Sequence, residues 1–555
     1  MLQLLLGGSG SGKTTLLYQR IRTRAEKGEK SILLVPEQFT SSTEGRIYRE
    51  LGDALSGMVE SFSFTSLAEK ILSTEGGAAV QTLSDAGRAV LVRRALEELQ
   101  DNVHYYHRHR RSAAFCQMAA QTIDELKSAG LSGRQLAQLA GACGAESGKL
   151  SELALIFQGY ETLLARSGMD PSDRLELAGA RLEEALARHS LPEFLRDRAV
   201  FIDEFDTFNA PKKRLLGAML AALPSVTVAL CDDGAPLLPG DLSLFSGAKQ
   251  VAAQLRQLAR KNGAEVAVPQ LLRKDLRHRN APGLAAVAEL LETGSCTADA
   301  PAGEVRLFAA PSREEEARAA AGAIRRLMRQ GVRCGKIAVV CRDIAKYRAA
   351  VRYEFRMAEI PLYCDEPTTP EFSAPATAVR ALLEIARGAD LTENLTTLAK
   401  TGLCALSEEQ VCALENYAYT WAPTAAAWRE KFERSPKGFG EQELTEEDLR
   451  NQERAEHARA LLVGAVDAFR AKVREVNAEA ISRAVYFCLK TLGAEEQQAA
   501  QVKAIRAGRG IPAAEEAARE WNMVMGLLNE MAHLLGEQTV TVAEYEDLFG
   551  LLLRS

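Results

Sequence analysis

Residues 2–17 read LQLLLGGSGSGKTTLL and carry the strongest fold signal in the chain. The first five of them form a short apolar run of the kind that a buried parallel strand uses. A glycine-rich turn follows, and the helix-compatible stretch TTLLYQRIRTRAEKG comes directly after it. This strand, loop and helix contain the complete pattern G-x-x-x-x-G-K-[ST] in its expected context. The sequence therefore predicts an α/β fold with a phosphate-binding loop.

The loop has the chemistry that a nucleoside triphosphate with Mg²⁺ requires. Glycines allow the backbone N–H groups to turn inward, and the helix that follows adds the positive end of its dipole. The side chain of Lys13 is expected to reach the outer phosphates, and the hydroxyl of Thr14 is expected to bind Mg²⁺. The residues predicted to bind ATP in this loop are Gly7, Gly8, Ser9, Gly10, Ser11, Gly12, Lys13, Thr14 and Thr15.

An acidic partner is expected on a neighbouring strand, because Mg²⁺ must be held from its far side and an attacking water must be oriented. The best match is AVFIDEF, residues 199–205, in which four apolar residues precede two acids. We predict that Asp203 binds the magnesium shell. Glu204 is then the predicted general base toward water.

The alternation of strand and helix patterns divides the chain. The run SILLVP at 31–36 predicts a second strand, and GMVESFSFTSLAEKIL at 57–72 predicts a third strand that passes into a helix. Amphipathic helices occupy the stretch from about Gln81 to His189, and sheet character returns at Asp203's strand and at SVTVALCDD, 225–233. A helicase-type motor domain with an inserted helical subdomain can contain such a helical block. A compact nucleoside kinase has little room for it. The predicted units are a first sheet domain at 1–75 and 190–290, a helical insertion at 76–189, the start of a second sheet domain at 304–373, and a helical insertion at 374–555.

The second sheet domain is predicted from two stretches after a loose Ala/Pro/Gly-rich boundary at 293–304. VRLFAAPSREEEARAAAGAIRRL predicts a strand and a helix, with a capping pattern in Ser312 and Glu315. KIAVVCRDIAKY through IPLYCDE predicts strand, helix and strand. Beyond Ala374 the pattern is helical.

Composition limits the partners. The net charge of -6 and a pI near 5.9 exclude nucleic-acid binding through bulk positive charge. Two local clusters remain, YYHRHRR at 105–111 and RKDLRHRN at 273–280, and each is either a solvated surface segment or a nucleic-acid contact.

The ten Cys are single, without metal-ligand or disulfide spacing, and no apolar run is long enough for a membrane span. We expect a cytoplasmic protein with no membrane contact.

Several segments together resemble AddB, the B subunit of the AddAB (RexAB) helicase-nuclease. They are LLLGGSGSGKTTLL, LLVPEQFT at 33–40, SFSFTSLA at 61–68, FIDEFDTF at 201–208, EEEARAAAGAIRRL at 314–327, and IAVVCRDIAKY with IPLYCDE. Apart from the phosphate loop, none is diagnostic alone. Their order and spacing carry the resemblance, which extends over the whole chain.

The resemblance implies a P-loop NTPase with the tandem RecA-like domains of a UvrD-like superfamily 1 helicase and large α-helical insertions. It implies a heterodimer with an AddA-type helicase-nuclease subunit that processes DNA double-strand breaks, contacting double-stranded ends and single strands. Within the family pattern, Gln38 joins the nucleotide-binding set. Arg342, at the end of the strand pattern 337–341, matches the position of an arginine that contacts the γ-phosphate across the domain cleft.

Three departures from the family pattern limit what is carried over. Family members commonly carry Gly at the position of Glu204, and VALCDDG supplies none of the glutamine motifs of active helicases. ATP binding is therefore the firmer expectation and translocation the weaker one. AddB proteins also continue into a nuclease domain with an iron–sulfur cluster, which we expect only in the parent protein, so Ser555 is expected not to be its natural end.

Two other functions stay open from the sequence. One is an independent P-loop ATPase or kinase that does not act on DNA. The other is a non-catalytic module for DNA binding and subunit docking, in which the phosphate loop is vestigial.

Overall fold

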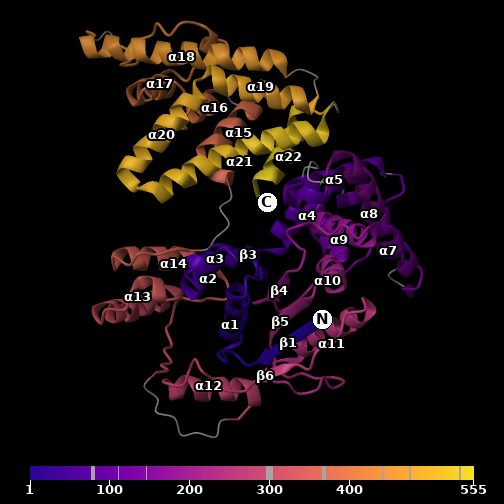
Figure 1. Cartoon of the computed structure of the whole chain (residues 1–555). Helices are drawn as coiled ribbons and strands as arrows, with labels where there is room; N and C mark the ends of the chain where they lie inside the picture. Colours follow the sequence, from indigo (N-terminus) through magenta and orange to yellow (C-terminus); the bar gives the residue numbers. More distant parts are fainter. Residues whose placement is uncertain are drawn as a thin grey trace.

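The protein is mostly helical and contains one six-stranded parallel sheet (Figure 1). This computed structural model describes residues 1–76, 82–99, 101–109, 112–144, 147–295, 304–364, 370–389, 391–440, 443–473, 477–536 and 539–554. The predicted α/β class is confirmed at this level. Most of the boundary at 293–304, the last two arginines of the cluster at 105–111, and Ser555 lie outside the described residues.

The sheet has the strand order β3-β2-β4-β5-β1-β6, and every neighbouring pair is parallel. Its strands are β1 Leu2–Gly7, β2 Ser31–Leu34, β3 Val59–Phe62, β4 Ala199–Ile202, β5 Ser225–Cys231 and β6 Gln270–Leu272. The first five were predicted from apolar runs. Strand β6 was not, because three half-buried residues give too short a pattern to separate from a loop.

Helices cover both faces of the sheet, as a parallel sheet requires. On one face, Leu17 and Ile21 of α1 pack with Leu5 and Leu33 of the sheet. The helices near this face are α1 Lys13–Glu26, α2 Thr40–Leu51 and α3 Asp53–Ser56. The other face is covered by α4 Phe64–Glu75, α10 Ala210–Ala222 and α11 Ser246–Lys261. Helix α9 Pro171–Ala187 was predicted as part of the helical insertion, and it packs against α4 and α10 and so shares the hydrophobic cluster of the sheet.

A helical block lies beside the sheet and is built from two distant parts of the chain (Figure 1). The first part comprises α5 Asp85–Glu98, α6 Ala113–Ser128, α7 Gly133–Ala140 and α8 Ser147–Ser167. The second comprises α15 Ala374–Arg387, α16 Leu391–Lys400, α17 Glu408–Trp421, α18 Glu446–Lys472, α19 Ala478–Thr491, α20 Ala494–Arg509, α21 Ile511–Leu535 and α22 Val542–Arg554. Buried side chains from both parts form one continuous hydrophobic cluster. The two helical regions therefore make one folded unit.

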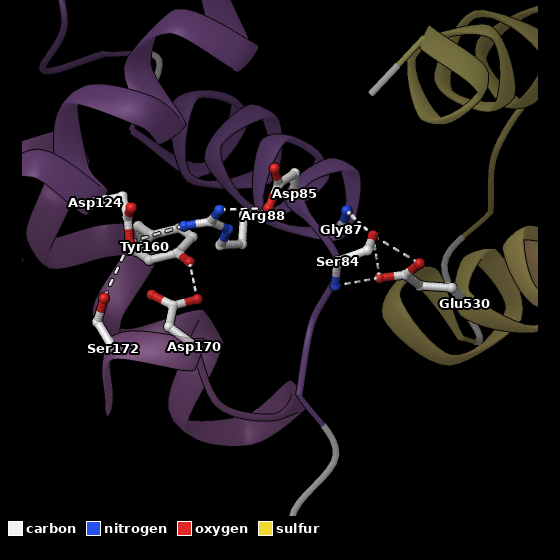
Figure 2. A network of polar contacts seen from close by, with 9 residues as sticks. All are labelled: Ser84, Asp85, Gly87, Arg88, Asp124, Tyr160, Asp170, Ser172 and Glu530. Atoms are coloured by element: carbon white, nitrogen blue, oxygen red, sulfur yellow. Dashed lines mark hydrogen bonds and ion pairs between the residues drawn. The ribbon is translucent and has the colours of Figure 1, made fainter. Parts of the chain in front are cut away.

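Polar contacts reinforce the junction between the two parts (Figure 2). Ser84, which caps α5, donates its hydroxyl to the Glu530 carboxylate of α21 at 2.8 Å, and its backbone N–H donates to the same group at 3.1 Å. Arg94 of α5 donates to the carbonyl oxygen of Leu534 at 2.8 Å. These bonds tie one side of α5 to a helix more than 400 residues away in the sequence.

A buried ionic network holds the other side of the same region together (Figure 2). Arg88 pairs with Asp124 at 3.0 Å. The hydroxyl of Tyr160 donates to the buried Asp170 carboxylate at 2.6 Å, and Lys127 pairs with Asp170 at 2.7 Å. Buried charges are retained only when paired in this way, so the network fixes how α5, α6, α8 and α9 meet.

Residues 304–364 differ from the sequence prediction. The predicted helices are present as α13 Arg313–Arg329 and α14 Ile344–Met357, and Ser312 caps α13 by accepting from the Glu315 N–H. The strands predicted in this stretch form no ladder among its described residues. Leu307, Val340 and Tyr363 are almost fully exposed. An extended segment becomes a strand only when a neighbour satisfies its N–H and C=O groups, and no described segment pairs with these.

Helix α12 Pro282–Thr293 connects the sheet to this region. No described helix of the protein is long and apolar enough to cross a membrane.

Candidate functional site

The carboxyl ends of β1, β4 and β5 meet at one edge of the sheet. Strand β5 pairs with β1 on one side and with β4 on the other, all in parallel. The glycine-rich loop follows β1, Asp203 follows β4, and Cys231 ends β5. Ligands of open α/β sheets bind at this edge, because connecting loops leave a crevice there.

A cavity of about 440 Å³ opens at this edge, within the range of ligand pockets. Its lining comprises Ser9, Gly10, Ser11, Gly12, Lys13, Thr14, Thr15, Arg46, Asp203, Glu204, Phe205, Asp206, Ala229, Cys231, Leu276 and Arg277. Seven consecutive loop residues and both predicted acids thus face one space, although 189 positions separate Thr14 from Asp203 in the sequence.

Two glycines give the loop its shape. Gly10 has a φ of +78° and Gly12 a φ of +90°, which other residues adopt only at a cost. A Cβ on Gly10 would also lie 2.7 Å from the Cβ of Arg277. Gly12 caps α1, so the free backbone N–H groups at the start of that helix are directed at the cavity. This geometry favours an anion.

Polar groups of the loop are arranged for an added partner. The Lys13 ammonium donates to the carbonyl oxygens of Gly7 at 2.7 Å and Gly8 at 2.8 Å. Burial lowers the pKa of Lys13, while Cys231 and Asp203 oppose this shift. The hydroxyl of Ser11 is buried and has no hydrogen-bond partner in the described part of the chain. A phosphate oxygen is the kind of acceptor that this hydroxyl lacks.

The oxygens of Thr14 and Asp203 fit a magnesium ion. Asp203 is buried, its carboxylate accepts the Glu204 N–H at 3.0 Å, and it also receives a hydrogen bond from Thr14. Burial raises the pKa of Asp203 above its usual value, and the Thr14 hydrogen bond opposes this shift. Mg²⁺ takes one or two protein oxygens and completes its shell with water and phosphate oxygens. No described cluster of three or more His, Cys, Asp or Glu offers an all-protein metal cage.

Glu204 sits in a strained backbone conformation. Its φ is +66°, the left-handed region in which a side chain costs about 1–2 kcal/mol relative to the usual helical region. Burial and the neighbouring Asp203 raise the pKa of Glu204. A glycine would hold the same backbone shape without strain, so the structure gives a physical reason for the glycine that the family pattern has here.

The remaining predicted residues lie elsewhere. Gly7 and Gly8 do not line the cavity, and their carbonyl oxygens accept from the Lys13 ammonium. Gln38 is exposed in a short 3₁₀ turn, Glu37–Phe39. Arg342 is exposed ahead of α14 and does not line the cavity.

The sequence pattern did not reveal one arginine of the site. Strand β6 pairs with β1 and carries the basic cluster at 273–280 over the loop. The Leu276 N–H donates to the Gly10 carbonyl oxygen at 3.0 Å, and the Arg277 guanidinium donates to the Ser9 hydroxyl at 3.2 Å. The charge run was visible in the sequence, but its position was not, because β6 was not predicted.

Arg46 is a second missed residue. It lies on α2, lines the cavity, and places its guanidinium 4.9 Å from the centre of the Tyr18 ring. Its charge opposes the raised pKa of both Asp203 and Glu204. No sequence pattern distinguishes it from other surface arginines of α2.

The fold and the loop define a class of protein. It is a parallel α/β protein in which a glycine-rich loop follows the first strand and ends at Lys13 and Thr14. Comparison with known families narrows this class. The chain belongs to the family described as "ADDB, N-terminal", whose model matches residues 4–288.

Individual relatives extend the match to almost the whole chain. Three proteins similar to it are each named as the B subunit of an ATP-dependent helicase/deoxyribonuclease. The one from Desulforudis audaxviator is 30% identical, with 98% of this chain and 48% of that protein covered. The one from Moorella thermoacetica is 29% identical, with 100% and 49% covered, and the one from Symbiobacterium thermophilum is 31% identical, with 78% and 38% covered. This chain therefore spans about half the length of these relatives or less.

The strain at Glu204 gives a test that separates structure from chemistry. We expect Glu204→Gly to stabilise the fold by about 1 kcal/mol, since the left-handed backbone suits glycine. Glu204→Gln should retain the strain. Both variants should bind Mg-ATP and lose ATP turnover, because neither side chain can accept a proton from water. Urea denaturation and phosphate release measure the two effects.

A matched control is Glu359→Gly, which relieves a similar φ of +53° at a position outside the cavity lining. It should stabilise the fold and leave turnover unchanged. Undiminished turnover in Glu204→Gln would remove Glu204 from the mechanism.

Proposed function

We propose that this chain is the ATP-binding, helicase-like part of a helicase–nuclease subunit that acts on DNA. One observation carries the proposal: Lys13, Thr14 and Asp203 surround a single cavity at the carboxyl edge of the sheet. The name shared by the relatives includes ATP dependence, which supports the same ligand. The fit of the buried Ser11 hydroxyl to a phosphate adds independent support.

Each residue then has a defined role. The N–H groups of residues 9–15 and the Lys13 ammonium bind the phosphates. Thr14 and Asp203 would hold Mg²⁺, which would supply positive charge to the outer phosphates. Glu204 accepts the proton of the attacking water, and its raised pKa makes it a better base than an ordinary surface carboxylate.

We propose that Arg277 is the arginine that contacts the outer phosphates in this conformation. Arg277 lines the cavity and contacts the loop through Ser9. A guanidinium at this position can bridge phosphate oxygens with two parallel hydrogen bonds. Arg342 would need the region 304–364 to move toward the cavity, as closure of a second domain would provide.

The domain assignment is also a proposal. We propose that 1–75 and 190–290 form the first of two RecA-like domains of a superfamily 1 helicase fold. Residues 304–373 would begin the second, with the strands predicted within VRLFAA at 305–310, at 337–341 and in IPLYCDE at 360–366 as its first strands. The segments 76–189 and 374–555 would be the helical insertions of the two domains, and their common core supports this pairing.

We further propose that the chain serves mainly as a scaffold for a partner motor. In a helicase that translocates, two sheet domains move against each other with each ATP cycle. Here the helical insertions of both proposed domains share one core and the Ser84–Glu530 contact, which restricts such movement. If these domains move little, another subunit must supply the movement along DNA. We therefore propose a cytoplasmic heterodimer with an AddA-type subunit that processes double-strand breaks. It fits the relatives' names, which describe one subunit of a larger enzyme.

Removing the loop ammonium tests the nucleotide site. Lys13→Ala should abolish measurable Mg-ATP binding, because Lys13 supplies the only lysine charge among the described residues that line the cavity. Titration with a fluorescent ATP analogue measures the affinity. Lys27→Ala, beyond the end of α1, is the matched control and should bind as the unmodified chain does. Equal affinity in both variants would indicate a vestigial loop and a docking function.

The two arginine assignments differ in a measurable way. Arg277→Ala should weaken ATP binding about tenfold, the loss of one charge-assisted hydrogen-bond pair of ~1.5 kcal/mol. Arg342→Ala should leave binding to this chain unchanged, since Arg342 does not line the cavity. The same titration compares them, and ADP serves as a control because it lacks the outermost phosphate. If only Arg342→Ala lost ATP affinity, Arg342 and not Arg277 would be the arginine that contacts the phosphates.

Hydrogen exchange tests the scaffold proposal. A non-hydrolysable ATP analogue should protect amides of the loop and of residues 275–278. It should leave exchange unchanged in α5 and α21, because their shared core is expected not to open with the nucleotide cycle. Faster exchange in α5 and α21 on nucleotide binding would show that the shared helical core opens during the nucleotide cycle. That result would contradict the scaffold role.

A further inference from the structure

Positive charge is concentrated in one short region of this acidic chain. Residues 304–364 contain 13 Lys and Arg against seven Asp and Glu, a net charge of +6, whereas the whole chain carries -6. The densest part is RRLMRQGVRCGK, residues 325–336, with five cations and no acid. We call residues 325–336 the basic segment.

The cations of the basic segment face outward. Helix α13 buries Ala317, Ala321 and Ile324, and among its residues only Ile324 lines the apolar cavity formed with α14. Arg326, Arg329 and the later basic residues are exposed. Arg326 and Arg329 lie on the last turns of α13, and Arg333 and Lys336 follow its end, so the exposed cations continue from the helix into the loop.

These cations lack acidic partners. Within the described part of the chain, Arg326, Arg329, Arg333 and Lys336 form no ion pair, whereas Arg318 earlier on the helix is paired with Glu354 at 3.0 Å. A helix C-terminus favours cations, but that effect ends within the last turn. Arg333 and Lys336 lie beyond α13, so the helix dipole does not account for them.

We propose that the basic segment binds the phosphate backbone of DNA. Four of its five cations are arginines, whose planar forks match phosphate oxygens better than the point charge of lysine. A repeating polyanion suits several unpaired cations in sequence, and the negative charge of the rest of the chain would direct it to this region. The inference rests on the proposed action on DNA and is independent of the phosphate loop.

The test neutralises three of these charges in the intact chain. The triple variant Arg326→Gln, Arg329→Gln, Arg333→Gln should lose at least tenfold in affinity for a fluorescein-labelled oligothymidylate and for a labelled blunt duplex at low salt. The slope of log affinity against log salt should fall by about two to three, since each lost phosphate contact removes roughly 0.7–0.9. Fluorescence anisotropy at several salt concentrations measures both.

The chain offers a control of equal charge. Lys503, Arg506 and Arg509 near the end of α20 are also exposed and form no ion pair among the described residues. Their triple change to Gln should alter DNA affinity less than twofold. Equal losses in both triple variants, or none in either, would overturn the proposal, as would absence of DNA binding by the unmodified chain.

Further measurements distinguish a DNA site from a damaged fold or a site for another polyanion. Mg-ATP affinity should be unchanged in the basic-segment variant, whereas Lys13→Ala should lose ATP and keep DNA binding, so failure of one site is distinguishable from failure of the other. Circular dichroism should show unchanged helicity. If labelled polyglutamate binding were lost while DNA binding persisted, the surface would belong to an acidic protein partner instead.

Discussion

The parallel pairing of β1, β5 and β4 is the constraint on which the candidate site depends. Because all three strands run in the same direction, whatever follows each of them emerges at the same edge. The phosphate loop and the acid at 203 are brought together by this rule, and a hydrogen bond from Thr14 to Asp203 joins them. A strand reversed at either position would send its functional residue to the opposite edge.

The same edge holds one of the described non-glycine residues with a left-handed backbone. Glu204 keeps a left-handed conformation, next to a buried carboxylate that disfavours its ionisation. Both effects cost stability, and neither improves packing. A left-handed backbone costs more for glutamate than for glycine, so the residue type and the backbone conformation disagree at position 204.

The helical block restricts the rest of the molecule. Helices from residues 85–167 and from residues 374–554 bury a common set of side chains, so these two parts of the chain are joined by a core separate from the sheet. A large shared apolar core resists opening, because each exposed side chain costs about 1.5–3 kcal/mol. The nearby region 304–364 has only a small core of Ala321, Ile324, Phe355 and Ile360, and its extended segments stay exposed.

The sequence by itself determined the local parts. The apolar run before Gly7, the glycine spacing up to Lys13 and the paired acids after Ile202 predicted a strand, a loop and a strand end, since each depends only on neighbouring residues. Only the tertiary structure decided the rest. Strand β6 exists because β1 offers it a free edge, and that pairing puts Arg277 on the loop. The stretch 337–341 has an equally good strand pattern but no neighbour among the described residues, so it forms none. Strand formation and long-range placement depend on partners that no local window contains.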